Sequence, residues 1–257
     1  MLLLAKNYKA DFDPTGWHLS EKIDGIRAFW DGKQLISRNN IPFNAPDWFI
    51  ECLPSNIQLD GELWISRKGF NEVSSVVRTE KGSDWSRVQY LLFDIPRTDF
   101  GPVENRWSIL QKLVIKINRD HIKMIPNTIC QGHDHLHKLL SLVIEHEGEG
   151  IMMRKPGSMY VNKRSDTLLK VKKFYDEEAI VTGHNVMMSN GREVTGMMGS
   201  LKCVNESGDE FKVGTGFTDH ERKNPPKIGS KITYKYFEKS KDGAPRFPVF
   251  VCVRDYE

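Results

Sequence analysis

The chain has 257 residues, of which 39% are hydrophobic and 28% charged, values typical of a folded globular protein that exclude a disordered or collagen-like chain. This length suits one large domain or two smaller ones, and we favour two. A formal net charge of +3 is too small to decide by itself whether the partner is a nucleic acid.

Cysteine spacing and hydropathy bear on the compartment. The four cysteines are far apart and form no Cys-x-x-Cys pair, so we expect free thiols in a reducing compartment, with two disulfide bridges as the alternative. No signal peptide or membrane span is visible, which predicts a cytoplasmic protein with no membrane partner. A chain trimmed of a leader would look the same, which leaves the periplasm open.

Residues 22–27, with the sequence Lys-Ile-Asp-Gly-Ile-Arg, carry three charged side chains and a glycine between two apolar stretches. On an extended segment Lys22 and Asp24 face the same side. Gly25 lets the backbone approach a ligand closely, and the planar guanidinium of Arg27 suits a phosphate. The cluster predicts a lysine nucleophile acting on a phosphate ester; the alternative is a charged turn on a surface hairpin.

An alternating run from Trp17 to Trp30 surrounds this cluster and is followed by Asp31-Gly32, which predicts a hairpin turn. We expect the return strand, residues 33–37, to place Arg38 at the entrance of the same site as Lys22.

Asp60 and Glu62 flank Gly61 within a second strand-like run. Because a carboxylate is costly to bury unpaired, one of them is expected to meet a cation, a metal or a ribose hydroxyl. A structural salt bridge is the alternative.

The middle of the chain mixes strand and helix patterns. Residues 70–77, 106–117 and 135–146 have helical spacing, whereas 88–95 is a short apolar run ending at a proline, as in a buried strand that includes Phe93.

Alternate histidines at His133, His135 and His137 suggest a metal site at first sight. They would not converge on one ion, so we favour a helix start with Asp134 as its N-cap.

Glu149 lies beside glycines at the start of an apolar strand, and Lys170 and Lys172 fall on one face of a later strand. Neighbouring cations repel, so the lysine face requires an anion, unless the strand is a solvated edge. Between Met153 and Phe174 seven Lys or Arg accompany one acid, which predicts a local positive field that attracts polyanions.

Beyond residue 174 the sequence contains five short β-like runs, separated by Gly, Asn, Asp and Pro, with no convincing helix. This pattern predicts a small oligonucleotide-binding (OB) barrel. We therefore expect two domains, residues 1–174 and 175–257, with a hinge near 173–176.

The order of these motifs resembles that of the covalent nucleotidyltransferases, and the chain is similar to a minimal ATP-dependent DNA ligase of the bacterial Lig E group. The motifs that carry the likeness are Lys22 to Arg27, Ser37-Arg38-Asn39, Asp60-Gly61-Glu62, Tyr90 to Asp94, Glu149-Gly150-Ile151 and Leu169 to Lys172. The resemblance implies an α+β fold, in which an adenylyltransferase domain of ATP-grasp-like antiparallel sheets with helices precedes an OB-fold β-barrel.

The resemblance also implies a role for each motif. Lys22 would attack the α-phosphate of ATP and hold AMP, with Asp24 and Arg27 beside the nick and the nucleotide. Arg38 and Glu62 would contact the ribose or the reacting phosphate, and Phe93 would stack on adenine. Glu149, with Glu62, would hold Mg²⁺ or Mn²⁺. Lys170 and Lys172 would grip the α-phosphate, while Ser20 would read the adenine edge.

The implied partner is nicked double-stranded DNA, bound by a monomer. The side chains expected to bind it are Arg27, Arg38, Arg154, Lys163, Arg164, Lys173 and Arg246. Two alternatives share part of this pattern: an RNA ligase shares the first domain, and an mRNA-capping-type guanylyltransferase shares the Lys-x-Asp-Gly motif and the barrel. A third is a non-catalytic module that binds nicks.

Overall fold

The computed structural model describes residues 2–9, 11–79, 83–172, 175–189, 191–236, 238–240 and 243–254. The chain separates into two compact units, Met1–Lys172 and Lys173–Glu257, and each has a hydrophobic core of its own. The first unit contains two five-stranded sheets and the second contains one. Lys173, one of the expected DNA-binding residues, lies outside the described residues.

One sheet of the first unit has the strand order β4-β3-β5-β6-β7. Its pairs are antiparallel except for β6 with β7. The Asp31-Gly32 turn joins β3 to β4 as expected, with Gly32 at a φ of 104°. The strands are β3 (Ile26–Trp30), β4 (Leu35–Ser37), β5 (Leu59–Trp64), β6 (Gln89–Asp94) and β7 (Ile122–Met124).

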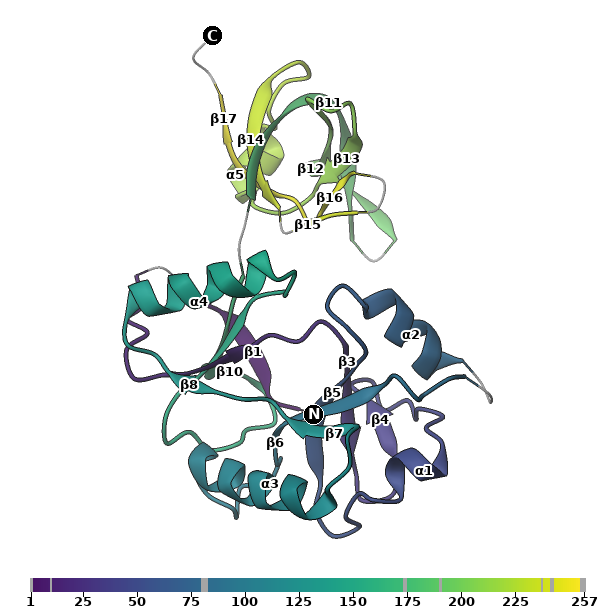
Figure 1. Ribbon diagram of the computed structural model, residues 1–257. Coiled ribbons are helices and arrows are strands. Elements are labelled where there is room, and N and C mark those ends of the chain that lie inside the picture. The colour runs from purple at the N-terminus through teal and green to yellow at the C-terminus, as the bar shows by residue number, and fades with distance from the viewer. Residues whose placement is uncertain are drawn as a thin grey trace. The chain divides into compact units, whose positions relative to one another are not determined.

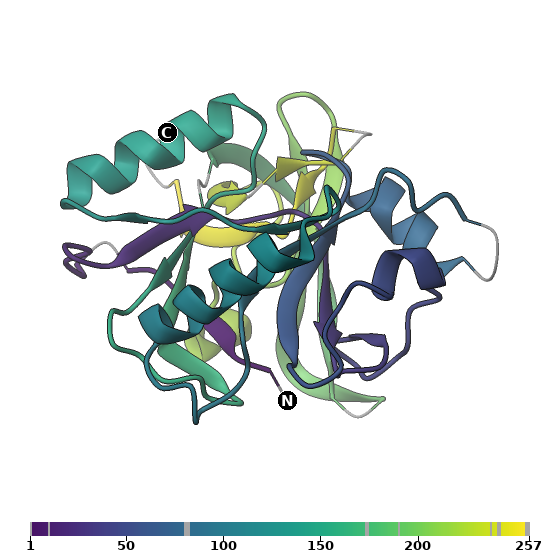
Figure 2. The ribbon, with the colours of Figure 1, turned by 60° about the horizontal axis from the view of Figure 1, so that its bottom comes forward.

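Three helices accompany this sheet in the first unit (Figure 2), and each buries apolar side chains in the core that the sheet shares. They are α1 (Asp47–Ile50), α2 (Phe70–Arg78) and α3 (Val103–Ile117). Phe49 of α1, Val73 of α2 and Leu110 of α3 are fully buried in one core with Trp30 of β3. Burial of this kind contributes roughly 1.5–3 kcal/mol for each large apolar side chain.

The other sheet of the first unit has the order β1-β10-β9-β2-β8, with β1 parallel to β10 (Figure 1). Because β10 lies between β1 and β9, the alternative of a solvated edge strand for the lysine-bearing run is wrong. Helix α4 (His133–Glu145) covers this sheet through Leu136 and Val143. The strands are β1 (Leu4–Asn7), β2 (His18–Glu21), β8 (Thr128–Ile129), β9 (Ile151–Arg154) and β10 (Arg164–Val171).

The Lys22–Gly25 segment crosses from one sheet to the other, since β2 belongs to the second sheet and β3 to the first. The alternative of a turn on a surface hairpin is therefore wrong. Gly25 is required here because a Cβ atom would collide with the backbone oxygen of Leu63. This close approach places the expected nucleophile between the sheets.

The start of α4 differs from our expectation. The N-cap is Gly132, and no side chain caps the helix, while Asp134 lies within the first turn. Gly132, at a φ of 128°, occupies the N-cap position instead of the expected Asp134. Asp134 still favours the helix through its negative charge near the N-terminus.

The second unit contains a sheet with the order β13-β12-β11-β14-β17. A parallel bridge joins Thr215, two residues after β13, to Val249 of β17, the strand at the other edge of the sheet. The expected strands are present, and a short helix, α5 (Asp219–Lys223), was missed. The strands are β11 (Tyr175–Ser189), β12 (Arg192–Asn205), β13 (Glu210–Val213), β14 (Lys231–Tyr236) and β17 (Val249–Val253), with a separate pair β15 (Glu238–Lys239) and β16 (Pro245–Arg246).

Candidate active site

A cavity of about 310 Å³ in the first unit is lined by residues from both of its sheets. It collects most of the charged and aromatic residues singled out from the sequence, although these are spread over 150 positions. The predicted residues that line it are Ser20, Lys22, Arg27, Arg38, Glu62, Phe93, Arg154, Arg164 and Lys170.

Lys22 lies at this cavity and pairs with Glu149 through Nζ and Oε2. The other oxygen of Glu149 lies 2.5 Å from Nζ of Lys172. The side chains of the three residues are between 18% and 25% exposed, so water screens their charges only partly. One carboxylate thus holds two of the predicted lysines together.

Backbone contacts fix this arrangement. The amide of Lys22 donates to the carbonyl of Gly150 over 2.8 Å. Gly150 has a φ of 152°, and a Cβ atom there would collide with the backbone oxygen of Val171. Only glycine allows the turn that carries Glu149 to pack this closely against β10.

Lys170 is half-buried in β10 and lines the cavity. Burial lowers its pKa, and the neighbouring cations Lys172 and Lys22 lower it further. The three lysines therefore form a positive cluster that favours a bound anion.

The guanidinium of Arg27, in β3, is hydrogen-bonded to a side chain and a backbone carbonyl of the protein. Its Nε and Nη2 donate to the two oxygens of Asp60 over 2.9 and 2.6 Å, and Nη1 donates to the carbonyl of Leu3 over 2.7 Å. Burial lowers the pKa of Arg27, but Asp60 outweighs this effect and raises the pKa above its ordinary value. Asp60 also accepts from Tyr160 over 2.7 Å, so the structural salt bridge is the correct reading for this aspartate.

Glu62 of β5 lies opposite Arg27 of β3 in the antiparallel register, and it lines the cavity. Burial raises the pKa of Glu62 to about 8, although Lys22 and Arg27 oppose this shift. Burial thus outweighs the two cations and favours the protonated carboxyl.

Arg154, expected to bind DNA, is only 6% exposed. It points inward from β9, and its Nη2 lies 3.0 Å from Oδ2 of Asp94. Asp94 also receives two hydrogen bonds from the fully buried Arg106. The inward orientation follows from the alternation of side chains along β9.

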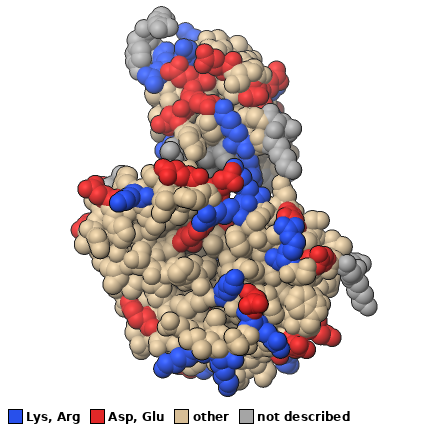
Figure 3. Space-filling model, viewed as in Figure 1, with Lys and Arg blue, Asp and Glu red and all other residues tan. Residues whose placement is uncertain are grey.

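Other basic side chains assigned to DNA binding are exposed. Arg164 is the first residue of β10 and donates to the carbonyl of Ala5, and Lys163 directly precedes the strand. Arg38 is exposed at the cavity that Lys22 also lines, and Arg246 is exposed in β16 of the second unit. On the face of the first unit drawn in Figure 3, basic side chains lie beside acidic ones, which moderates the positive field inferred from the sequence.

Asp24 is half-buried and is not among the residues that line the cavity. It lies in the segment that crosses between the sheets, which is not a strand, so the side-by-side placement with Lys22 does not follow from strand alternation.

Several cavity residues were not singled out from the sequence. They are His18, Trp107, Ile125, Asn127 and Met152. His18 and Met152 lie on the same strands as Ser20 and Arg154, so period-two spacing from those residues would have found them. No sequence signal indicates Trp107, which reaches the cavity from α3.

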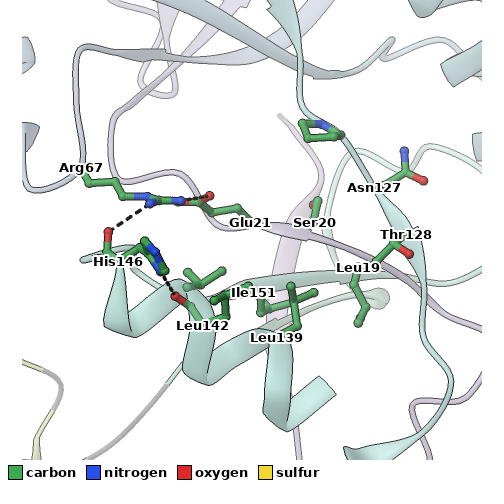
Figure 4. A pocket seen from close by; sticks show the side chains of 12 residues that line it. Leu19, Ser20, Glu21, Arg67, Asn127, Thr128, Leu139, Leu142, His146 and Ile151 are labelled. Carbon is green, nitrogen blue, oxygen red and sulfur yellow. Dashed lines mark hydrogen bonds and ion pairs between the residues drawn. The ribbon is translucent and has the colours of Figure 1, made fainter. Parts of the chain in front are cut away.

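A second cavity, of about 520 Å³, lies on α4 and shares Ser20, Glu21 and Asn127 with the first (Figure 4). Arg67 crosses one end of it, donating to both oxygens of Glu21 over 2.9 and 2.8 Å. Arg67 also donates to the carbonyl of His146 over 3.1 Å. This arginine, also missed from the sequence, ties β2 to the turn before Glu149.

Neither a cluster of metal ligands nor a membrane-spanning helix occurs in the described part of the chain. No group of three or more His, Cys, Asp or Glu side chains among those residues is arranged to hold a metal ion. Across the same residues, no helix is both long and apolar enough to cross a membrane.

Comparisons with known proteins agree with this architecture. Residues 3–172 match the ATP dependent DNA ligase domain, and residues 191–254 match the DNA ligase OB-like domain. The chain is 37% identical over 235 residues to a DNA ligase of Haemophilus influenzae, covering 91% of this chain and 85% of that one.

Solved structures extend the comparison. A Lig E DNA ligase, studied for DNA binding with a minimal scaffold, superposes with a TM-score of 0.88 at 37% identity and covers 98% of both chains. The Chlorella virus DNA ligase-adenylate gives a TM-score of 0.56 at 28% identity, covering all of this chain and 98% of that one. The family match over most of the chain and the Lig E likeness confirm the expected nucleotidyltransferase and OB-fold domains, and the chain belongs to the ATP-dependent DNA ligases.

Proposed function

We propose that the chain seals nicks bearing a 5′-phosphate and a 3′-hydroxyl in duplex DNA, using ATP and a covalent adenylate on Lys22. The observation that carries this proposal is the position of Lys22 at a cavity between two sheets, next to Glu149, Lys172 and Lys170. An amine held within a cluster of cations is suited to attack a polyanion.

Three displacements at phosphorus would follow. Nζ of Lys22, having lost its proton, bonds to the α-phosphorus of ATP as the bond to pyrophosphate breaks. A 5′-phosphate oxygen of DNA then bonds to that phosphorus as the bond to Nζ breaks. Finally the 3′-hydroxyl, losing its proton, attacks the 5′-phosphorus and expels AMP. Each displacement concentrates negative charge that Lys170 and Lys172 would stabilise.

Glu62 and Glu149 would hold a divalent ion, Mg²⁺ or Mn²⁺, whose preferred ligands are carboxylate oxygens, phosphate oxygens and water. Burial raises the pKa of Glu62 to about 8 despite Lys22 and Arg27, and a bound cation would stabilise its ionised form further. When bound, the ion would neutralise phosphate charge. Glu149 also pairs with Lys22 through one carboxylate oxygen and with Lys172 through the other, and so holds the two lysines near each other.

The remaining motif residues would serve the nucleotide and the nick. Phe93 and Ser20 would contact the base, and Arg38 the ribose or reacting phosphate, since all three line the cavity. Asp24 and Arg27 would lie beside the nick and the nucleotide, Arg27 with its guanidinium oriented by Asp60.

The proposed DNA surface rests on exposed basic side chains. In the first unit Lys163 and Arg164 would contact phosphates, as would Arg246 in the second. Arg154 is too buried to join them. Binding through such contacts would weaken steeply with salt.

We propose a monomer located in a reducing compartment, the cytoplasm. The four cysteines Cys52, Cys130, Cys203 and Cys252 are free thiols, which supports this location over the periplasm.

Lys22→Ala tests the proposal directly. We expect the variant to form no covalent adduct with ATP and to seal no nick, while its unfolding midpoint stays close to that of the wild type. Mass spectrometry of protein incubated with ATP and Mg²⁺ or Mn²⁺ locates the added AMP. Covalent GMP in place of AMP would support a capping-type guanylyltransferase, sealing of RNA alone an RNA ligase, and nick binding without any adduct a non-catalytic module.

A further inference from the structure

Protein atoms engage three of the five N–H groups of Arg27. Nε and Nη2 donate to the two oxygens of Asp60, and Nη1 donates to the carbonyl of Leu3. Within the part of the chain that the structure describes, these bonds leave two N–H groups, one on each Nη atom. The side chain is 18% exposed and lines the cavity, so its guanidinium is placed to meet a ligand there.

Asp60 receives a second fixed donor, the hydroxyl of Tyr160. This tyrosine is 2% exposed, and its hydroxyl donates over 2.7 Å to Oδ2 of Asp60, the oxygen that Nη2 of Arg27 also reaches. The hydroxyl in turn accepts from the amide of Leu3 over 3.2 Å. Burial and the charge of Asp60 raise the pKa of Tyr160 above its ordinary value, so the hydroxyl keeps its proton and remains a donor. The carboxylate of Asp60 therefore cannot rotate without losing the tyrosine as well as the arginine.

The tyrosine is itself anchored within the first unit. The guanidinium of Arg106 lies over its ring, with 5.8 Å between Cζ and the ring centroid. Arg106 also donates over 3.1 Å to the carbonyl of Ser158, two residues before Tyr160. Leu3 and Leu168 pack with the tyrosine in a small apolar cluster. Both the ring and the backbone near it are thus held by neighbouring groups.

This hydrogen-bond network joins the two sheets whose residues line the cavity. Arg27 and Asp60 belong to β3 and β5 of one sheet, whereas Leu3 directly precedes β1 and Tyr160 lies between β9 and β10 of the other. The network therefore sets the direction of the Arg27 guanidinium relative to both sheets. Because a hydrogen bond weakens steeply as its angle departs from linear, that direction decides how well the remaining N–H groups bind an anion.

We propose that Tyr160 is a positioning residue for phosphate recognition: through Asp60 it orients Arg27 so that the two remaining N–H groups donate to the phosphate of a ligand in the cavity. A planar guanidinium suits the paired oxygens of a phosphate. The inference rests on the proposed function, which supplies two ligands of this chemistry, ATP and the 5′-phosphate of a nick. Tyr160 is buried and acts through Asp60, without touching the ligand itself.

The test compares each ligand with a form that lacks the phosphate. Calorimetry in the Lys22→Ala background measures the binding of ATP and of adenosine. Fluorescence anisotropy in the same background measures the binding of a nick that ends in a 5′-phosphate or a 5′-hydroxyl. In each comparison the ratio of the two affinities reports what the phosphate adds.

We expect Tyr160→Phe to lower this ratio about fivefold in at least one of the two comparisons, the effect of weakening one hydrogen bond. The comparison that responds identifies the phosphate that Arg27 binds. Affinity for adenosine and for the 5′-hydroxyl nick should stay within about twofold of the value without the substitution, because neither offers a phosphate to the arginine.

Tyr90→Phe is the matched control. Tyr90 is fully buried in the same unit, and its hydroxyl donates to the carbonyls of Ala28 and Leu59 over 3.0 and 3.2 Å. Both variants lose one buried hydroxyl and should lower the unfolding midpoint to a similar extent. Only Tyr160→Phe should lower an affinity ratio.

A double-mutant cycle separates positioning from general stability. Arg27→Lys keeps a cation for Asp60 but lacks the guanidinium fork, so we expect it to lower the responding ratio by itself. Adding Tyr160→Phe to Arg27→Lys should then lower the ratio no further, since the group that the tyrosine orients is gone.

Unchanged ratios in Tyr160→Phe, an equal fall in Tyr90→Phe, or a further fall in the double variant would overturn the inference. The proposed function is checked separately by the covalent adduct of the wild type with ATP. Absence of that adduct would overturn the proposed function alone, because the affinity ratios still report whether Tyr160 controls phosphate binding.

Discussion

Nζ of Lys172 lies 2.5 Å from Oε1 of Glu149. The other oxygen of that carboxylate pairs with Lys22, so one acid links the proposed nucleophile to a lysine 150 positions later in the chain. Because the three side chains are largely buried, their mutual attraction is stronger than that of a surface pair. The charges of these three residues are therefore coupled to one another.

Lys172→Ala should lose adenylylation even though Lys22 remains. Removing one cation that stabilises the reacting phosphate is expected to slow formation of the covalent adduct by about a hundredfold or more. The rate of AMP incorporation with saturating ATP measures this effect. Lys155→Ala is the matched control, since Lys155 is an exposed cation of the same basic segment and should leave the rate unchanged. Normal AMP transfer in Lys172→Ala would show that the phosphate is held elsewhere.

Much of this site could be predicted because its motifs are local. The Lys22 cluster, the Asp31-Gly32 turn and the buried strand at Phe93 each depend on a few adjacent residues, and their order indicated the family. The partner of Arg27 could not be predicted in this way, because its bond to Asp60 requires β3 and β5 to pair in one particular register.

The inward orientation of Arg154 was missed for a related reason. Counting basic residues along a segment treats each as exposed, whereas alternation along β9 turns this one toward Asp94. Likewise aspartate is a residue type that often forms an N-cap, but Gly132 occupies the N-cap of α4 and Asp134 lies in the first turn. In each of these examples tertiary pairing or backbone conformation outweighs the local preference.

Glu62→Gln should change the pH dependence of stability. The pKa of Glu62 in the folded protein is about 8, above the ordinary value of 4.5, so the folded state keeps a proton that the unfolded state releases. The free energy of unfolding of the wild type therefore falls as pH rises from about 4.5 to 8, by on the order of a few kcal/mol. Glutamine has no such proton, and the variant should gain stability relative to the wild type across this window.

Thermal unfolding without divalent ions, at pH 5 and pH 8.5, measures this difference. We expect the unfolding midpoint of Glu62→Gln to exceed that of the wild type by a larger margin at pH 8.5 than at pH 5. An equal difference at both pH values would mean that Glu62 is ionised in the folded protein at neutral pH.

Asp94→Ala should strongly destabilise the first unit. Asp94 is fully buried and pairs with Arg106, which is fully buried too, and with Arg154. Loss of the carboxylate leaves two buried guanidinium groups without their anion, at an expected cost of about 3–5 kcal/mol. Urea unfolding measures it. Asp99→Ala removes an exposed pair with Arg97 and should leave the unfolding midpoint unchanged; similar midpoints for both variants would contradict the prediction.

Arg67 joins the strand that precedes Lys22 to the turn that precedes Glu149 (Figure 4). It donates to both oxygens of Glu21, and to the carbonyl of His146. Gly148 packs directly on this pair, since a Cβ atom there would lie 2.9 Å from Oε1 of Glu21. The arginine therefore acts as a clamp between the two segments.

Arg67→Ala should slow adenylylation while leaving ATP binding largely unchanged. Without the clamp, the Glu149 turn can shift relative to Lys22, and a small misplacement of reacting groups lowers the rate of chemistry more than affinity. We expect kcat for adduct formation to fall about tenfold with KM within about twofold. Lys68→Ala is the matched control, because Lys68 is the next residue and makes an exposed pair with Glu147 that does not reach β2. An equal loss in Lys68→Ala, or a loss in Arg67→Ala that appears only in KM, would show that the arginine does not position Lys22 and Glu149.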